Sequence, residues 1–210
     1  MRAKESASDP RPTLTDLMRI WFKGILDPIG ALLNRLGLAP NTLTLIGLAG
    51  NFIGAIFLAQ GMLLVGGIVI LVMGPIDALD GTMARLRGES SDFGAFVDSV
   101  TDRYSELTIL GGLLVYFLGQ GDRLTSGLIF AAAAGSVLVS YVRARGEALG
   151  FRVKGGILTR VERYLVLGPS LVFGIPTIGI GIVAILANVT ALQRILLVRR
   201  QAYHRASGED

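Results

Sequence analysis

Residues 77–102 read DALDGTMARLRGESSDFGAFVDSVTD and place four aspartates, Asp77, Asp80, Asp98 and Asp102, within sequence that otherwise suits a membrane interior. An aspartate at the centre of a bilayer costs about 3 kcal/mol on insertion scales. An isolated carboxylate in apolar surroundings also tends to take up a proton. Four such groups cannot persist charged without cations, so this segment indicates a chemical role inside a membrane protein.

The composition of the whole chain supports a polytopic membrane protein. Of 210 residues, 51% are hydrophobic and 17% are charged, and the mean hydropathy is +0.59. The chain has no cysteine, which excludes a disulfide framework and a thiolate metal site. Residues 1–12 are polar and are expected to be disordered. Residues 200–210 are expected to form a polar tail.

Six stretches approach the length of about 20 residues that a bilayer requires. They are 42–60, 62–84, 93–119, 124–145, 160–175 and 177–198. We therefore predict an all-α fold in which residues 41–199 form one domain of six transmembrane helices. Residues 13–40 are predicted to hold an interfacial amphipathic helix over 13–26 and a linker, because TLTDLMRIWFKGIL repeats apolar side chains at helical spacing.

The distribution of lysine and arginine predicts the orientation. One set of loops holds only Arg123, whereas the opposite loops and both termini are rich in basic residues. The positive-inside rule then places both termini and the aspartates on the cytoplasmic side of the cell membrane. The net charge of +4 follows from this topology. No nucleic-acid partner is expected, since the arginines alternate with hydrophobic spans.

The aspartates form two pairs, each on one helix face. Asp77 and Asp80 are three residues apart, and Asp98 and Asp102 are four apart. If the connecting RLRGESS turn makes the two helices antiparallel neighbours, the two faces meet. Carboxylates alone suit magnesium, manganese or calcium rather than zinc, and two divalent cations would neutralise four of them. The alternative is an ion-conduction path or proton relay, but clustering at one membrane face favours chemistry on a membrane-borne substrate.

Small residues lie on or beside these faces. Gly81, Ala84 and Gly94 would let a bulky ligand approach the backbone, although small residues also serve helix packing in membranes. Arg85 lies one turn after Gly81, where its guanidinium could pair with Asp80 or with a phosphate of a substrate.

Taken together, these residues fill the pattern DxxDGxxAR, eight residues, then GxxxDxxxD, without a departure. The chain thereby resembles the CDP-alcohol phosphotransferases. The resemblance implies six transmembrane helices, a homodimer, two divalent cations (Mg²⁺ or Mn²⁺), and transfer of a substituted phosphate from a CDP-linked lipid to an alcohol with release of CMP.

The resemblance also implies residue roles. Asp77 and Asp98 would bind both metal ions, Asp80 one and Asp102 the other, and Asp102 would be the general base for the acceptor hydroxyl. The residues implied for binding the CDP-lipid are Asn41, Thr44, Gly81, Ala84, Arg85, Ser91 and Gly94. Without the resemblance, Asn41 would be interpreted as a helix cap after Pro40.

The second half of the chain indicates the acceptor. Arg143, Arg163 and Arg194 are candidates for a pocket that binds a second phosphate, because guanidinium forks match phosphate oxygens. Arg194 lies in an apolar span and could instead snorkel to the interface. The segment SYVRARGEA followed by GG and RVER resembles that of phosphatidylinositol phosphate synthases, one subfamily, although Arg143 stands where that subfamily often has lysine.

The resemblance therefore implies that CDP-diacylglycerol and inositol 1-phosphate give phosphatidylinositol phosphate and CMP. The alternative in the same class is phosphatidylglycerophosphate synthase, with glycerol 3-phosphate as acceptor. An ether-lipid donor stays open, because the apolar spans do not identify the tail linkage. Ion or proton transport by the aspartates is the alternative of a different class, and a noncatalytic lipid-binding scaffold would not require four aspartates.

Overall fold

The computed structural model describes residues 14–88, 91–153 and 155–207, and for residues 14–23 it describes the backbone alone. Within these ranges the chain forms seven α-helices and no strand, which confirms the all-α prediction. The helices are α1 Leu14–Arg35, α2 Pro40–Ala59, α3 Leu63–Arg87, α4 Asp92–Gly119, α5 Arg123–Ala148, α6 Arg160–Val172 and α7 Pro176–Ser207. The predictions for residues 1–12 lie outside the described residues.

Each of the six predicted spans coincides with one helix from α2 to α7. Among the described residues, α2, α3, α5 and α7 are long and apolar enough to cross a membrane, which makes this a multi-pass membrane protein. α4 has 28 residues but carries charged side chains through its first half. α6 has 13 residues and spans about 20 Å, less than the hydrocarbon core of about 30 Å. The count of six spans therefore stays a prediction.

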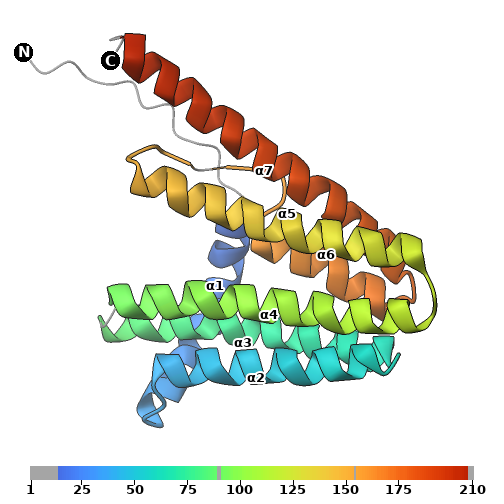
Figure 1. Ribbon diagram of the computed structural model, residues 1–210. Helices are drawn as coiled ribbons and strands as arrows, with labels where there is room; N and C mark the ends of the chain where they lie inside the picture. The colour runs from blue at the N-terminus through green and yellow to red at the C-terminus, as the bar shows by residue number, and fades with distance from the viewer. Residues whose placement is uncertain (1–13, 89–90, 154, 208–210) are drawn as a thin grey trace, which may run out of the picture.

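Helices α2 to α7 close into a ring. α2 packs on both α3 and α4, α3 packs on α6, α6 on α7, α7 on α5, and α5 on α4. α3 and α4 make few direct contacts, although they follow one another in the chain. The condition on which the two aspartate faces were expected to meet, that these helices are packed neighbours, is therefore not fulfilled, because α2 packs beside each of them. α1 runs across the other helices behind the ring (Figure 1).

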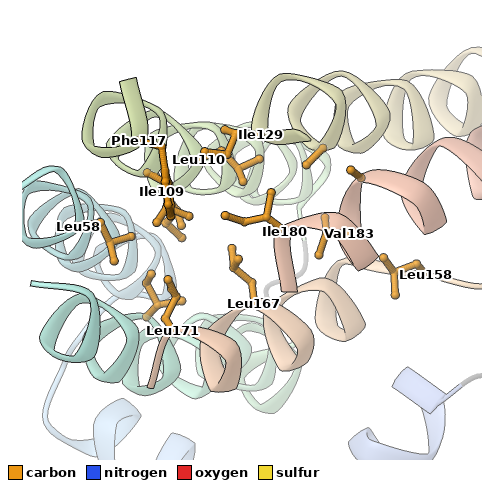
Figure 2. Packing of buried hydrophobic residues seen from close by; sticks show 14 residues of the cluster. Leu58, Ile109, Leu110, Phe117, Ile129, Leu158, Leu167, Leu171, Ile180 and Val183 are labelled. Carbon is orange, nitrogen blue, oxygen red and sulfur yellow. The ribbon is translucent and has the colours of Figure 1, made fainter. Parts of the chain in front are cut away.

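Aliphatic side chains from every helix of the ring fill its interior. Leu58, Ile70, Ile109, Leu171 and Ile180 are at most 1% exposed and belong to one cluster. Figure 2 shows Leu58, Ile109, Leu171 and Ile180 pointing into the ring. Close backbone approach tightens the packing, since a Cβ on Gly112 would lie only 2.3 Å from the carbonyl oxygen of Ala55. Such contacts matter in a membrane, where helices associate through van der Waals packing.

α1 is longer than the predicted amphipathic segment 13–26. The sequence suggests a stop at Pro28, yet the helix continues through it to Arg35. Leu26 and Leu33 pack on a cluster that includes Met83 of α3, and the Asn34 amide donates to the Met83 carbonyl at 3.2 Å. These contacts hold the second half of α1 against α3. The amphipathic faces predicted for residues 14–23 lie outside the described side chains.

α7 extends well past the predicted end at residue 198. Its 32 residues span about 48 Å, more than a bilayer core requires. The last turns hold the loop between α5 and α6: the amide of Gln201 bonds the backbone N–H and C=O of Arg152 at 2.9 and 2.8 Å. Arg205 donates to the Gly150 carbonyl at 2.9 Å and lies over the Phe151 ring. Residues through Ser207 are thus helical rather than a loose polar tail.

Candidate active site

The aspartates gather at one end of the ring, contributed by α3 and α4, the helices that pack on either side of α2. Asp77 and Asp80 lie in the last turns of α3, and both are buried. Asp102 is buried in the first half of α4, and Asp98 is half-buried one turn before it. The two helices follow one another, so the Gly88 turn reverses the chain and brings both pairs to the same end. The two pairs of aspartates therefore meet at this end of the ring, as predicted, although α3 and α4 are not packed on each other.

α2 supports the α3 carboxylates. The hydroxyl of Thr44 donates to Asp80 Oδ2 at 2.5 Å, and the backbone N–H of Gly81 donates to Asp80 Oδ1. One turn along α2, a Cβ on Gly47 would lie 3.1 Å from Asp77 Oδ1. A glycine at that position lets the two helices approach closely, so α2 packs directly against the Asp77 and Asp80 carboxylates.

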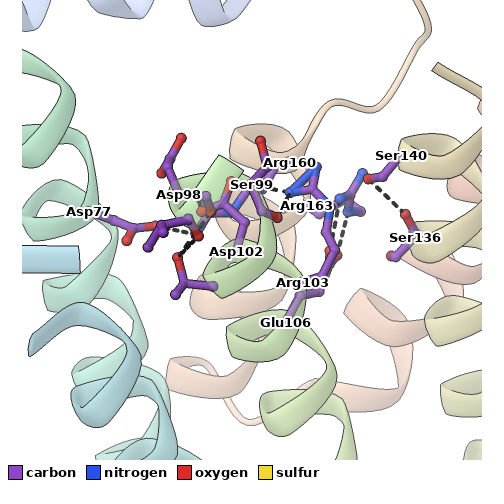
Figure 3. Close-up of polar contacts among 12 residues, drawn as sticks. Asp77, Asp98, Ser99, Asp102, Arg103, Glu106, Ser136, Ser140, Arg160 and Arg163 are labelled. Atoms are coloured by element: carbon purple, nitrogen blue, oxygen red, sulfur yellow. Dashed lines mark hydrogen bonds and ion pairs between the residues drawn. The ribbon is translucent and has the colours of Figure 1, made fainter. Parts of the chain in front are cut away.

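A guanidinium lies between the two aspartate pairs. Arg160, the first residue of α6, directs Nη2 to Asp77 Oδ2 and Nη1 to Asp102 Oδ1 (Figure 3). Arg103 reaches the other oxygen of Asp102 at 3.3 Å. Asp98 lies within the electrostatic range of Arg160 and Asp77. Arg160 thus joins α3, α4 and α6 at the centre of the carboxylates.

The donor set fits hard divalent cations. It consists of four carboxylates, three of them at most 8% exposed. The positively charged guanidinium of Arg160 lies between two of these carboxylates. Among the described residues, no three acidic, histidine or cysteine side chains stand close enough to hold a metal ion together. The ligand roles of Asp77, Asp80, Asp98 and Asp102 stay predictions that the chemistry of the set supports.

The residues implied for nucleotide binding flank the aspartates. Ser91 caps α4 by accepting from the Gly94 N–H at 3.0 Å, and a Cβ on Gly94 would lie 4.0 Å from Asn41 Oδ1. The first turns of α2 and α4 therefore meet there. The prediction that Asn41 caps α2 is wrong, because the helix begins at Pro40 after Ala39, which makes no side-chain cap.

On α3, the implied nucleotide residues follow Asp80 along one helical turn. Arg85 donates to the Thr82 hydroxyl at 2.9 Å, and its Nη1 lies 3.3 Å from the position of a Cβ on Gly81. Ala84 is half-buried one turn after Asp80. Arg85 itself is exposed, so its guanidinium lies at the open side of the aspartate cluster.

The three arginines predicted to bind a phosphate have protein partners. Arg163 is 3% exposed and forms a two-pronged pair with Glu106 at 2.5 and 2.9 Å. Arg194 is 6% exposed and donates to the carbonyls of Gly155 and Val139, so the snorkelling alternative is wrong. Arg143 is exposed and pairs with Glu147 at 3.0 Å. Electrostatic interactions link Arg194 to Arg143 and Arg163, which places all three in one region.

Two residues at the site were not predicted from the sequence. Glu106 continues the four-residue spacing of Asp98 and Asp102, a signal that was available. Arg160 lies in a segment with many basic residues, and its residue type alone does not distinguish it from them. Its position depends on the start of α6, which the reciprocal hydrogen bonds of Thr159 and Glu162 fix as a capping box.

Comparison with known proteins agrees with this arrangement. The family model for CDP-alcohol phosphatidyltransferases matches residues 37–198. A relative named phosphatidylinositol phosphate synthase, from Streptomyces avermitilis, is 39% identical over an alignment that covers 90% of this chain and 84% of the relative.

Solved structures of the phosphatidylinositol phosphate synthase of Mycobacterium tuberculosis share the fold. One with CDP-DAG bound has a TM-score of 0.77 and 31% identity, and covers 83% of this chain and 93% of that one. Another, in complex with manganese and citrate, has a TM-score of 0.78 and 30% identity, covering 82% and 88%.

Proposed function

Since this chain belongs to the CDP-alcohol phosphatidyltransferase family, we propose that it transfers the phosphatidyl group of CDP-diacylglycerol to inositol 1-phosphate, giving phosphatidylinositol phosphate and CMP. The observation that carries the proposal is the meeting of four aspartates from α3 and α4 at one end of the ring, beside a cluster of arginines. The names of the similar proteins support the same donor and acceptor.

Each aspartate has a proposed task. Asp77 and Asp98 would bind both of two divalent cations, Asp80 one and Asp102 the other. When bound, Mg²⁺ or Mn²⁺ would neutralise the carboxylates and polarise the donor diphosphate. Thr44 orients Asp80 through its hydrogen bond, so one carboxylate oxygen has a fixed direction. The neighbour that holds manganese supports a metal at this site.

Asp102 also takes the proton in this proposal. The acceptor hydroxyl oxygen forms a bond to the lipid-bearing phosphorus while the bond from that phosphorus to the CMP oxygen breaks, and the hydroxyl proton passes to Asp102. In the structure Asp102 Oδ1 is ion-paired with Arg160, so this oxygen accepts a proton more readily once that guanidinium has moved away.

Substrate binding divides between the two sides of the ring. For the donor, we propose contacts from Asn41 and Thr44 on α2, Gly81, Ala84 and Arg85 on α3, and Ser91 and Gly94 at the start of α4. For the acceptor phosphate, we propose Arg143, Arg163 and Arg194, whose electrostatic coupling places positive charge together. An anion between them would relieve their mutual repulsion.

An acceptor panel tests the proposal. Purified protein with CDP-diacylglycerol and Mg²⁺ is supplied with inositol 1-phosphate, free inositol, glycerol 3-phosphate or serine, and CMP release is measured. We expect release with inositol 1-phosphate that EDTA abolishes. Preference for glycerol 3-phosphate would make the protein a phosphatidylglycerophosphate synthase. Ion flux in liposomes without CMP release would make it a transporter.

The orientation and assembly are also proposals. Both termini and the aspartates would face the cytoplasm, because the basic residues flank that end of the spans. A homodimer follows from membership in the family rather than from a visible motif. Labelling of single cysteines in intact cells tests the orientation, and mass measurement in mild detergent tests the dimer.

A further inference from the structure

We propose that Arg160 is a positioning residue that competes with divalent cations for Asp77 and Asp102: its guanidinium occupies the place between them and is displaced from it when the cations bind. The inference rests on the proposed function, since it takes the aspartates as metal ligands. It assigns to Arg160 a role in setting the affinity of the site for metal.

The geometry supports direct competition. One guanidinium directs its two Nη atoms to carboxylates that come from different helices, α3 and α4. The Asp77 and Asp102 side chains are 7% and 11% exposed, so this is not a surface ion pair that water screens. An oxygen lone pair that faces a guanidinium N–H is not available to a metal ion. The guanidinium and a metal ion therefore compete for these lone pairs, and their like charges repel each other at this short range.

Arg160 and its neighbour Arg163 are held by different groups: Arg160 pairs with two aspartates of the proposed metal site, whereas Arg163 pairs with Glu106. The Arg160 Nε is buried without a hydrogen-bond partner among the described residues, and the Tyr164 ring lies 5.3 Å from its guanidinium carbon. Arg163, one turn later, is held by both oxygens of Glu106. Arg160 has no ion pair besides those with the two aspartates within the part of the chain that the structure describes, so its long side chain can turn once they are lost, while the capping box fixes the backbone.

The charge balance favours displacement. Four aspartates face two nearby guanidinium groups, those of Arg160 and Arg103. Divalent cations supply more charge and the oxygen coordination that carboxylates prefer. Once displaced, the Arg160 guanidinium remains beside the site, where it matches the phosphate oxygens of an incoming substrate. Metal loading would then prepare the site for the diphosphate.

Measured Mn²⁺ affinity tests the inference apart from catalysis. Mn²⁺ binding to purified protein in detergent is followed by electron paramagnetic resonance for the wild type and for Arg160→Gln, Arg160→Lys and Arg103→Gln. We expect Arg160→Gln to lower the Kd by about tenfold or more, because the competitor no longer occupies the site. Arg160→Lys should lower it by about threefold, since an ammonium cannot bridge both carboxylates.

Arg103→Gln is the matched control, because it removes the same charge beside Asp102 without removing a bridge. We expect its Kd to stay within about twofold of the wild-type value. The melting temperature of Arg160→Gln should fall in EDTA and recover in Mn²⁺, because the metal replaces the lost cation.

The outcomes separate the two proposals. An unchanged or higher Kd in Arg160→Gln overturns the competition while leaving the proposed function in place, and so does an equal decrease in Arg103→Gln. If Arg160→Gln does not fold, an unchanged Kd in Arg160→Lys overturns it instead. Wild-type protein that binds no Mn²⁺ would remove the proposed metal site and this inference together.

Discussion

The carboxylates of α3 and α4 and the arginines of α5 to α7 lie at the same end of the ring, yet they are neutralised differently. On the arginine side, Arg163 has Glu106 and Arg194 has two backbone carbonyls. On the carboxylate side, four aspartates share Arg160 and Arg103. The negative charge of the carboxylates is thus only partly balanced by nearby guanidinium groups, whereas the buried arginines have hydrogen-bond partners within the protein.

This difference indicates two ways to build a binding site in a membrane. The arginines are fixed before substrate arrives, so their positions are set by packing. In the proposed function the aspartates depend on divalent cations from solution, so their charge would be balanced fully only when those cations bind. Removing a group from either side should consequently produce different failures.

The largest effect is expected on the carboxylate side. Asp98→Asn should lower the rate of CMP release by about 10³-fold or more, because a ligand proposed to bind both metal ions loses its charge. The matched control is Asp122→Asn, at the opposite end of the molecule, where the side chain caps α5. Release that survives in Asp98→Asn would contradict the two-metal assignment.

On the arginine side, the largest effect should be on stability. Glu106→Gln leaves the buried Arg163 guanidinium without its counter-charge and should cost about 3–5 kcal/mol of unfolding free energy. Denaturant unfolding in detergent measures the loss. The double variant Glu106→Gln with Arg163→Met should recover much of it, and a single variant as stable as the wild type would show that the pair contributes little.

A smaller effect is expected at the exposed member of the arginine set. Arg143→Ala should raise the KM for inositol 1-phosphate by about tenfold, equivalent to one lost charge-assisted contact, while leaving the KM for CDP-diacylglycerol unchanged. Glu147→Gln is the control, since it removes only the partner of Arg143. Equal changes in both variants would mean that Arg143 acts through that pair and not through the acceptor.

The smallest effect lies away from both sides. Hydrogen bonds from Thr125 hold the pKa of Asp122 below its usual range. The cap therefore stabilises the protein above the ordinary carboxyl pKa, and that stability is lost as the pH falls through the lowered value. Asp122→Ala should lower the melting temperature slightly at pH 7, and its difference from the wild type should shrink below about pH 4. A difference that grows on acidification would contradict the cap.

Local sequence patterns predicted most of the helices and the aspartate faces. Apolar length located α2, α3 and α5 and the start of α7 to within about three residues, because the bilayer imposes that length. The spacing from Asp77 to Asp102 set which carboxylates share a face, since helical geometry is local. The predicted end of the first helix at residue 26 was wrong, because contacts with Met83 stabilise helical residues beyond Pro28 as far as Arg35.

Long-range pairing was not predictable in the same way. Asp77 and Arg160 are 83 residues apart, and their contact depends on the order of helices around the ring. The same applies to α7, where residues 200–210 were predicted as a polar tail because their polar composition carries no membrane signal. Residues through Ser207 are helical because Gln201 and Arg205 bind the loop beside them.

The C-terminal end of α7 limits how this protein can be engineered. Gln201 and Arg205 clasp residues 149–152, and the same loop leads directly to Arg160. A truncation or fusion junction placed before Gln201 would remove these hydrogen bonds and change the loop that leads into α6. Affinity tags, fluorescent reporters and crystallisation partners should therefore be joined after Ser207, where the helix has already made its last contact with the loop.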